Sequence, residues 1–302
     1  MVRISVVIPT LDRPGPLTAC LRALSQSFLP NAETIVVSDG GTVDLGRWLA
    51  PFVEPLRLRY IETSPGGPAA ARNHGLAAAR GDIVVFVDDD CRPRPGWLHA
   101  LTSCVSPSLP RAAGGTTFNG LTANPYAEAA QLILDLVARY EHETHGGARF
   151  FPSNNLAFPT ERLRCLGGFD ESFRTAEDRE LCRRWRQAGF ALVQVPEAIV
   201  DHDVCLNLFG FARKFFAYGR GAARLHSSGN DSSFAESAAF HLRLPVLAGP
   251  QLARYGLRRG AGLLALLTLW EVANLAGFLS ATPRRFIGNA VARKASRERQ
   301  AL

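Results

Sequence analysis

The sequence lacks the glycine and cysteine motifs that mark several large classes of nucleotide-binding and metal-binding proteins. No GxGxxG follows a predicted strand, and the nearest pattern, Gly219 to Arg224, lacks the third glycine and lies in a helical region. No GxxxxGK[ST] is present, which excludes a P-loop. The six cysteines form no CxxC pair, so the sequence indicates reduced thiols in a cytoplasmic protein rather than a zinc site or a disulfide scaffold.

Two further absences narrow the possible compartment and partners of the protein. The apolar segment Ile4 to Ile8 begins almost at the first residue, which leaves no room for a secretory signal peptide. Zinc-finger spacing, basic heptads and aromatic RNA-binding signatures are also missing, so no nucleic-acid partner is expected. The net charge of +7 nevertheless favours an anionic partner, such as a nucleotide or a membrane surface.

The most informative stretch is the apolar run Ile83 to Val87, which leads directly into Asp88, Asp89 and Asp90. An unbroken apolar run of this length is typical of a strand buried on both faces of a parallel sheet. Ligands of such sheets bind beyond the carboxyl ends of the strands. Adjacent carboxylates repel one another, and hard oxygen ligands suit Mg²⁺ or Mn²⁺. The aspartates therefore predict either a divalent metal site or a solvated acidic turn.

Strands and helices alternate along the first hundred residues. Strands are expected at 4–8, 34–37 and 56–61, and helices at 16–28 and from 68 onward. The second strand also ends in an aspartate, Asp39, and the two glycines after it let the backbone approach a ligand. This alternation predicts an α/β fold with a mostly parallel, Rossmann-like sheet flanked by helices.

A second acidic centre, Glu177 and Asp178, lies in the first turn of a predicted helix. Thr175 is the expected N-cap of this helix and Gly189 its expected end. The positive end of the helix dipole should lower the pKa of Asp178. The polar segment 141–147 is expected to be a mobile loop. Further strands are expected at 112–118 and 191–195, and a helix at 127–140.

The C-terminal third contains the most apolar window, Ala261 to Ser280. Its length suits a membrane span, but Glu271 and Asn274 are costly in a bilayer core. Basic residues flank the window: Arg254, Arg258, Arg259, Arg284, Arg285, Arg293 and Lys294. A helix lying on an anionic membrane is the favoured interpretation, followed by packing on the catalytic domain or on a dimer partner, and then by a true span.

Six short motifs occur in order along about the first 205 residues. They are Val7-Ile8-Pro9-Thr10, Val37-Ser38-Asp39-Gly40, Ala71-Arg72-Asn73-His74-Gly75, Asp88-Asp89-Asp90, Gly167-Gly168-Phe169-Asp170 and Glu177-Asp178. In this order and spacing they resemble the motifs of glycosyltransferase family 2, inverting enzymes of the GT-A fold that use nucleotide sugars. The resemblance implies a catalytic domain over 1–205, with a nucleotide-binding half at 1–100 and an acceptor half at 101–205, and a helical extension over 206–302.

The resemblance also implies roles for individual residues. Asp39 would accept a hydrogen bond from N3–H of uracil or thymine, which favours a UDP- or dTDP-sugar donor. Either Asp12 or Arg13 would lie near the nucleotide. The other residues expected near the nucleotide are Pro9, Thr10, Arg72, Asp88 and Asp89.

The metal site and the general base are implied in the same way. Asp90 would bind Mn²⁺ or Mg²⁺ directly, and Asp88 would reach either the metal or the ribose. His202 would contact the metal or the diphosphate, although a lone histidine is more often structural. Asp178 would be the general base that takes the proton of the attacking acceptor hydroxyl, so single displacement with inversion is expected.

Two other functions remain open at this point. A sugar nucleotidyltransferase has a related sheet, but it needs a glycine-rich basic loop that Thr10 to Pro14 does not supply. A non-catalytic carbohydrate-binding or scaffold protein is the other alternative, and retention of both acidic centres disfavours it. The acceptor is a glycan, a lipid such as a polyprenyl phosphate, a small molecule or a peptide.

Overall fold

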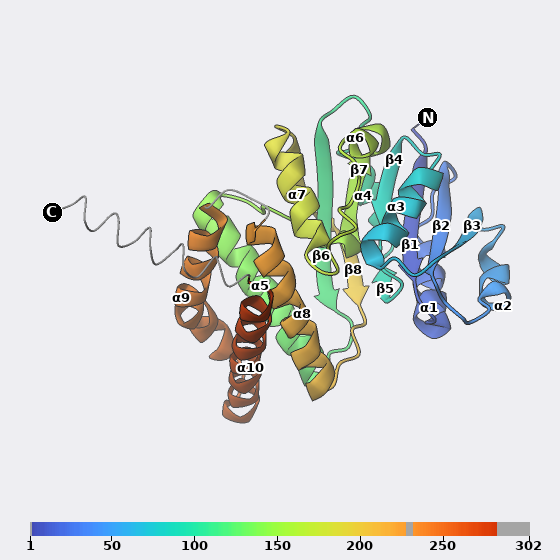
Figure 1. The fold of residues 1–302 in the computed structure, drawn as a ribbon. Helices are drawn as coiled ribbons and strands as arrows, with labels where there is room; N and C mark the ends of the chain where they lie inside the picture. Colours follow the sequence, from blue (N-terminus) through green and yellow to red (C-terminus); the bar gives the residue numbers. More distant parts are fainter. Residues whose placement is uncertain (1, 228–231, 283–302) are drawn as a thin grey trace.

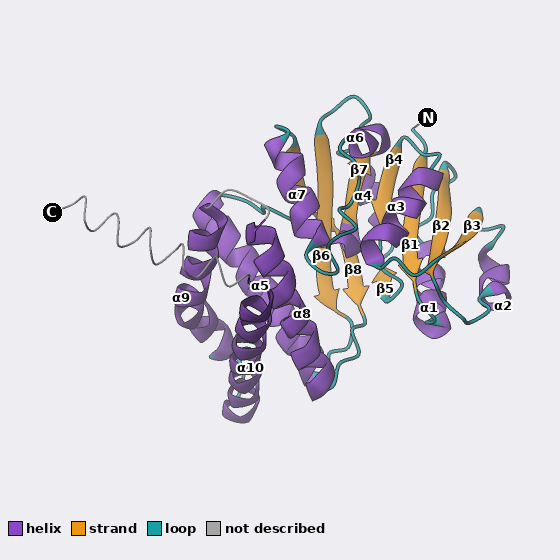
Figure 2. Ribbon diagram, viewed as in Figure 1, coloured by secondary structure: helices purple, strands orange, loops and turns teal. Residues whose placement is uncertain are grey.

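The computed structural model describes residues 2–227 and 232–282, and for residues 232–236 it describes the backbone only. These residues build a sheet of eight strands in the order β3-β2-β1-β4-β7-β6-β8-β5. Helices cover both faces of the sheet, and a group of long helices, α5 and α8 to α10, lies beside it (Figures 1 and 2). The predicted α/β fold with a C-terminal helical extension is confirmed.

The first half of the sheet is parallel, as the alternation predicted. Strand β1 pairs in parallel with β2 and β4, and β2 pairs in parallel with β3. The core residues of β1 and β4 are buried on both faces, which explains their unbroken apolar sequences. The elements of this half are β1 (Ile4–Thr10), α1 (Pro14–Ser25), β2 (Ala32–Asp39), α2 (Gly46–Leu49), the 3₁₀ helix η1 (Ala50–Phe52), β3 (Leu58–Thr63), α3 (Pro68–Ala78) and β4 (Ile83–Phe86).

The second half of the sheet is mixed. Strand β7 pairs antiparallel with β4 and β6, whereas β6 and β8 are parallel and β5 pairs antiparallel with β8. The elements are β5 (Cys91–Pro93), α4 (Trp97–Thr102), β6 (Arg111–Asn119), α5 (Pro125–His145), the 3₁₀ helix η2 (Ser153–Asn155), β7 (Leu156–Pro159), α6 (Thr160–Cys165), α7 (Glu177–Gln187) and β8 (Ala191–His202). The carboxyl end of β8 therefore lies beside the residues that follow β4.

Strand β8 is longer than the predicted segment 191–195. The register between β6 and β8 shifts after Gly114, so that Thr116 pairs with Ile199, and Pro196 lies in the irregular part. Proline cannot donate to a sheet ladder, so a bulge accommodates it without ending the strand. The sequence pattern missed this continuation.

The polar segment 141–147 is not the loop that its composition predicted. Residues 141–145 form the last turns of α5, and Gly146 ends the helix with φ of 73° while its N–H donates to His142 O at 2.9 Å. A polar run at the exposed end of a long helix has the composition of a loop, and the prediction was wrong for that reason.

The predicted cap of α7 is also wrong. The N-cap residue is Ala176, with φ of 64°, and no side chain caps the helix. The hydroxyl of Thr175 instead donates to Ala217 O at 2.8 Å, in the first C-terminal helix. Gly189 follows the end of the helix with φ of 79°, as expected.

Three apolar clusters stabilise the molecule. Two cover the opposite faces of the sheet, and the third joins α5 to α8 (Leu208–Ser227), α9 (Ser232–Leu252) and α10 (Leu257–Ala281). Leu136, Phe215, Phe240 and Trp270 represent the four helices in this third cluster. One face of α10 therefore packs on the rest of the chain. The division of domains at residue 205 stays a prediction, because α5 shares a core with the helices beyond it.

Helices α8 and α10 cross at two glycines. A Cβ atom on Gly219 would lie 1.9 Å from Asn274 O, and one on Gly277 would lie 1.9 Å from Phe216 O. Only hydrogen fits at these positions, so the two backbones touch without an intervening side chain.

We expect Gly277→Ala to destabilise the protein by about 1–3 kcal/mol, because the new methyl group must push the two helices apart. Gly262→Ala in the same helix is the matched control. A Cβ atom there meets nothing within 4 Å, so the gain in helix propensity should stabilise the protein by about 0.5–1 kcal/mol. Urea unfolding of both variants measures the difference, and equal effects would contradict the close crossing.

Candidate active site

The three aspartates after β4 point into three different environments. Asp89 is fully buried, whereas Asp88 and Asp90 keep partly exposed carboxylates. Each has at least one basic partner. Asp88 pairs with Arg72, Asp89 pairs with Arg13, and Asp90 pairs with both Arg13 and His202. The expected electrostatic repulsion within the run is therefore relieved by three cationic or ionisable side chains.

Asp89 links β4 to the loop after β1. Thr10 Oγ1 donates to Asp89 Oδ2 at 2.6 Å, and Arg13 Nε donates to the same oxygen at 3.2 Å. Burial raises the pKa of Asp89 to about 6, against the opposing effects of Arg13 and Thr10. Because no surface of Asp89 is exposed, its carboxylate acts on the site by holding Arg13 in place.

Arg72 connects the two acidic centres. Its guanidinium donates to Asp88 Oδ1 at 2.7 Å and to Glu177 Oε1 at 2.9 Å, and it lies over the ring of Phe169. The Arg72 side chain is only 4% exposed. The two segments that the sequence marked as acidic, 88–90 and 177–178, therefore meet in one place although they are almost ninety residues apart.

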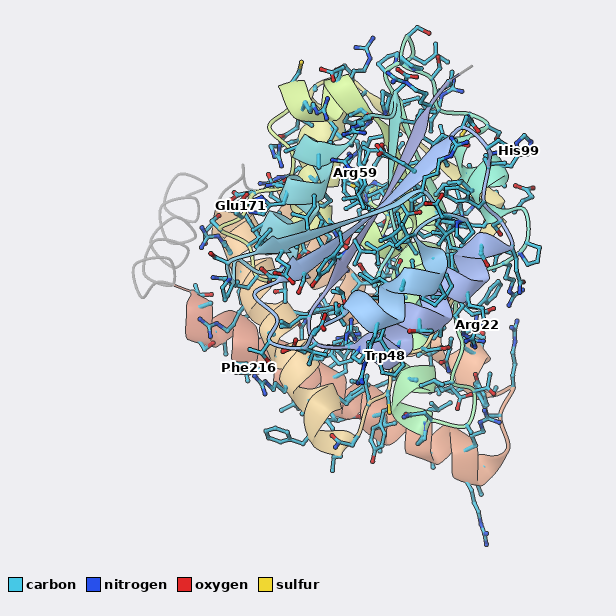
Figure 3. All side chains as sticks on the ribbon, turned by 90° about the vertical axis from the view of Figure 1, so that its right-hand side faces the viewer. Arg22, Trp48, Arg59, His99, Glu171 and Phe216 are labelled. Atoms are coloured by element: carbon cyan, nitrogen blue, oxygen red, sulfur yellow. The ribbon has the colours of Figure 1, made fainter. Side chains whose placement is uncertain are left out.

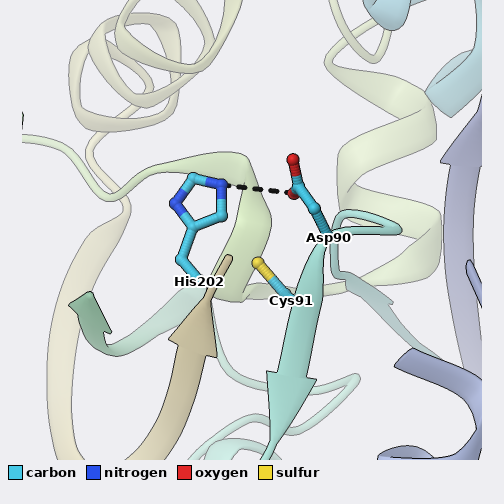
Figure 4. Close-up of side chains that lie close together, drawn as sticks. All are labelled: Asp90, Cys91 and His202. Carbon is cyan, nitrogen blue, oxygen red and sulfur yellow. Dashed lines mark ion pairs between the residues drawn. The ribbon is translucent and has the colours of Figure 1, made fainter. Parts of the chain in front are cut away.

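Asp90 and His202 face one another across β5 and β8 (Figure 4). His202 Nε2 lies 3.2 Å from Asp90 Oδ1, and Arg13 donates to Asp90 Oδ2 at 3.0 Å. Burial would raise the pKa of Asp90, but His202 and Arg13 hold it well below its usual range. The Asp90 carboxylate is therefore ionised over the whole physiological pH range.

The donor atoms of this corner fit a divalent cation. Asp90 Oδ1 is buried and has no hydrogen-bond donor of acceptable geometry among residues 2–227 and 232–282. The ligand atoms of Asp90, Cys91 and His202 lie within 4.8 Å of one another. Burial raises the pKa of the Cys91 thiol well above its usual value. Mn²⁺ and Mg²⁺ prefer oxygen ligands to sulfur, so Asp90 and His202 are the better candidates of the three.

Asp88 lies outside this cluster of potential ligands. Its carboxylate pairs with Arg72, which leaves Asp90 and His202 as the closest pair of ligands that the sequence had proposed. Both predicted roles of Asp88, towards the metal or towards the ribose, stay predictions.

Asp39 and Asp12 shape the loops at the other edge of the site. Asp39 accepts hydrogen bonds from the N–H groups of Gly66 and Gly67, at 2.6 and 2.8 Å. Asp12, with φ of 50°, accepts from the N–H groups of Thr42 and Val43. A carboxylate has room for further donors beyond two, so Asp39 still offers acceptor capacity to a base.

Asp178 lies in the first turn of α7, directly after Glu177. Its Oδ1 accepts the N–H of Arg179 at 2.7 Å, and its side chain is half-buried. Burial raises the pKa of Asp178, and the nearby charges of Arg179 and Arg72 oppose this only in part. The expectation of a lowered pKa from the helix dipole is therefore wrong, because desolvation outweighs it.

Several residues around the site escaped the sequence analysis. Asn154 Nδ2 lies 3.4 Å from His202 Nδ1, and Asn155 Oδ1 accepts the indole N–H of Trp97 at 2.9 Å. Arg174 donates to Gly66 O and so ties the segment before α7 to the loop that Asp39 holds. The run of two asparagines before β7 was the only visible signal, and its partners lie far away in the sequence.

Known proteins resemble this chain in both sequence and fold. Residues 5–105 match the family described as Glycosyl transferase family 2. A pre-mycofactocin glycosyltransferase of Mycobacterium tuberculosis is 34% identical over 236 residues, which cover 74% of this chain and 47% of that protein. Glycosyltransferase AglE of Haloferax volcanii is 27% identical over 228 residues, 72% of each chain. The present chain spans about half the length of the mycobacterial relative.

Solved structures share the fold across almost the whole chain. The mannosyltransferase PcManGT from Pyrobaculum calidifontis, in complex with GDP-Man and Mn²⁺, has a TM-score of 0.66 at 19% identity, covering 93% of this chain and 87% of its own. Residues 1–349 of TarS from S. aureus, in complex with UDP, have a TM-score of 0.55 at 17% identity, covering 93% and 83%. Residues 5–105 therefore carry a glycosyltransferase family 2 domain, and the chain as a whole has the GT-A fold.

Proposed function

We propose that this protein transfers a sugar from a nucleotide sugar to an acceptor hydroxyl, by a single displacement that inverts the anomeric centre. One observation carries the proposal: buried Arg72 bridges Asp88 after β4 and Glu177 beside Asp178. The bridge joins the segment of the proposed diphosphate-binding aspartates to the turn that carries the proposed general base, Asp178. Family membership and the names of the related glycosyltransferases support it.

The donor side is formed by residues at the carboxyl ends of β1, β2 and β4. Asp39 is the proposed acceptor for the N3–H of uracil or thymine, which favours UDP or dTDP. Asp12 and Arg13 border the loop after β1, where Pro9 and Thr10 end the strand. Solved structures of similar fold are complexes with GDP-Man, UDP or UDP-GlcNAc. Titration of the protein with UDP, dTDP and GDP therefore tests which nucleotide base it prefers.

Asp90 and His202 would hold Mn²⁺ or Mg²⁺. The bound ion would act as a Lewis acid that neutralises the charge developing on the departing diphosphate. Arg13 holds Asp90 from the side away from His202, and Asp89 holds Arg13 in turn. This chain of contacts keeps the carboxylate oriented.

Asp178 would take the proton of the attacking hydroxyl. A carboxylate whose pKa is raised by burial is a stronger base than an exposed one. The positive charges of Arg179 and Arg72 beside it favour the ionised form of Asp178 against the effect of burial.

Asp178→Asn should lower kcat for sugar transfer by about 10²- to 10⁴-fold, because the amide keeps the shape but cannot accept the proton. The dissociation constant for UDP with Mn²⁺ should stay within about twofold of wild type. In wild type, kcat should fall as the pH drops through the raised pKa of Asp178, so the acid limb lies above pH 3.9, the ordinary value for aspartate.

Glu161→Gln on α6 is the control for the loss of one carboxylate, since the Glu161 side chain is 77% exposed and pairs with Arg164. A folded Asp178→Asn variant with near-wild-type transfer would refute the base assignment. Absence of any Mn²⁺-dependent donor hydrolysis or transfer in wild type would favour the scaffold alternative.

Asp90→Asn should weaken Mn²⁺-dependent binding of UDP by about 10- to 100-fold, because it removes the anionic ligand. Asp201→Asn is the matched control: Asp201 is the neighbour of His202 in sequence but pairs with Arg94. Isothermal titration of UDP with Mn²⁺ and with excess EDTA measures both variants. If UDP affinity depended equally on Mn²⁺ in the two variants, Asp90 would not be a metal ligand.

A peripheral contact with an anionic membrane is part of the proposal. Helix α10 is the one described helix long and apolar enough to span a bilayer by length and composition, yet only 28% of its most apolar window is buried. Its outer face exposes Leu257, Leu264, Val272, Leu275 and Leu279, and α9 exposes Leu242 and Val246. Phe216 lies on the outside of α8 (Figure 3).

Basic residues accompany this apolar face and favour an anionic lipid surface as its partner. Arg243, Arg254 and Arg258 are exposed on α9, on the connection to α10 and at the start of α10. Arg259 is engaged with Glu128. The predicted contributions of Arg284, Arg285, Arg293 and Lys294 lie outside the described residues. The same proposal places the protein in the cytoplasm, at the inner face of the membrane.

The protein should cosediment with vesicles of phosphatidylglycerol and phosphatidylcholine at low salt and much less with phosphatidylcholine alone. The double variant Leu242→Ser/Val246→Ser should reduce the bound fraction severalfold, because both side chains are more than three-quarters exposed. Leu109→Ser, exposed on the sheet side, is the control. Absence of vesicle binding would refute the proposed membrane contact. A dimer that light scattering detects and the double variant disrupts would instead assign the apolar face to contact with a second copy of the chain.

A further inference from the structure

Helix α8 lies against the start of α7 and borders the site. The hydroxyl of Thr175 donates to Ala217 O at 2.8 Å, and a Cβ atom on Gly221 would lie 2.4 Å from Thr175 Oγ1. Thr175 comes three residues before Asp178, and Ala217 comes directly before Tyr218. This tight contact therefore brings the middle of α8 next to the turn that carries Asp178.

Lys214 and Tyr218 are neighbours on α8, four residues apart and so on the same side of the helix. Lys214 Nζ lies 5.7 Å from the centroid of the Tyr218 ring, and the ring packs edge-on against Phe215 at 5.7 Å. Tyr218 is 42% exposed and Lys214 is half-buried. Both side chains are accessible to a ligand.

The charges that act on Tyr218 come from Lys214 and from the acidic residues of the proposed site. The ammonium of Lys214 lowers the pKa of Tyr218, but burial and the carboxylates of Asp178, Glu177 and Asp88 raise it by more. The phenol is therefore protonated at neutral pH and available as a hydrogen-bond donor. Tyr218 is therefore within electrostatic range of the proposed base, next to the Thr175–Ala217 contact.

The cations of the site differ in what they contact. Arg72 forms ion pairs with Asp88 and Glu177, and Arg13 with Asp89 and Asp90. Within residues 2–227 and 232–282, by contrast, no carboxylate forms an ion pair with Lys214, and the Tyr218 hydroxyl makes no hydrogen bond. A half-buried ammonium without a counter-ion, beside a free phenol donor, is suited to an oxyanion.

We propose that Lys214 and Tyr218 form an acceptor subsite that binds an anionic group, a carboxylate or a phosphate, on the acceptor. Lys214 supplies the charge and Tyr218 a directed hydrogen bond, so the acceptor hydroxyl is positioned towards Asp178. This inference rests on the proposed transferase function, and it specifies the class of acceptor. It makes Lys214 and Tyr218 positioning residues for the reaction.

The test compares two acceptors that differ in one group, p-nitrophenyl glucoside and p-nitrophenyl glucuronide. Wild type should use the glucuronide with kcat/KM at least about tenfold higher. Lys214→Met should reduce this preference to within about twofold, chiefly through KM for the glucuronide, and Lys214→Arg should restore most of it. Tyr218→Phe should raise the same KM severalfold.

Arg22→Met is the control for loss of one positive charge. Arg22 is exposed on α1 and lies across the molecule from Phe216 of α8 (Figure 3). It should leave the preference unchanged. No preference in wild type, or an equal loss on both acceptors in Lys214→Met, would overturn the subsite.

Two binding measurements distinguish failure of the acceptor subsite from failure of the proposed transferase function. Lys214→Met should bind UDP with Mn²⁺ within about twofold of wild type, and a tenfold loss would assign Lys214 to the donor diphosphate and overturn the subsite. Calorimetry with the glucuronide alone should show binding to wild type and at least about tenfold weaker binding to Lys214→Met. If that difference holds while no donor is hydrolysed or transferred, the transferase function fails and the anion site stands. If wild type transfers sugar but the two proteins bind the glucuronide equally, only the subsite fails.

Discussion

The buried guanidinium of Arg72 is the interaction on which the site depends. It lies between Asp88 and Glu177 with only 4% of its side chain exposed, and these carboxylates overcome the burial that would lower the pKa of Arg72. A buried charge is tolerated only when it is paired, and removal of one partner typically costs about 3–5 kcal/mol. The segments after β4 and at the start of α7 therefore cannot separate without exposing or stranding this charge.

The same logic assigns different tasks to three adjacent aspartates. Asp88 faces Arg72, Asp89 turns into the protein towards Thr10 and Arg13, and Asp90 faces His202. Among the three, only Asp90 has a buried carboxylate oxygen that accepts no hydrogen bond of acceptable geometry from the described part of the chain. The three aspartates look alike in the sequence, but their partners give them different tasks. Asp88 pairs with Arg72, Asp89 positions Arg13, and Asp90 is the candidate metal ligand.

The sequence predicted those parts of the molecule whose causes are local. The run Ile83 to Val87 is apolar because β4 is buried on both faces, and the three aspartates come directly after the strand ends. The pKa of Asp178 was predicted in the wrong direction, because the helix terminus is a local feature whereas the burial that dominates comes from other segments. β5 escaped prediction since three residues are too few to show an alternation, and its pairing with β8 is long-range.

Lys214 and Tyr218 illustrate the same limit at the level of function. In the sequence they belong to an aromatic and basic helix without a motif, and only the packing of α8 on Thr175 brings them to Asp178.

Helix α8 connects the chemistry to the part of the chain where the family motifs end. It touches Thr175 through Gly221 and Ala217, and it touches α10 through Gly219 and Gly277. Both contacts are backbone approaches at glycine, where even a methyl group would force the elements apart. The position of α8 is therefore fixed from two sides, by α7 and by α10. The helices beyond residue 205 therefore share a core with α5 and contact the turn that precedes Asp178.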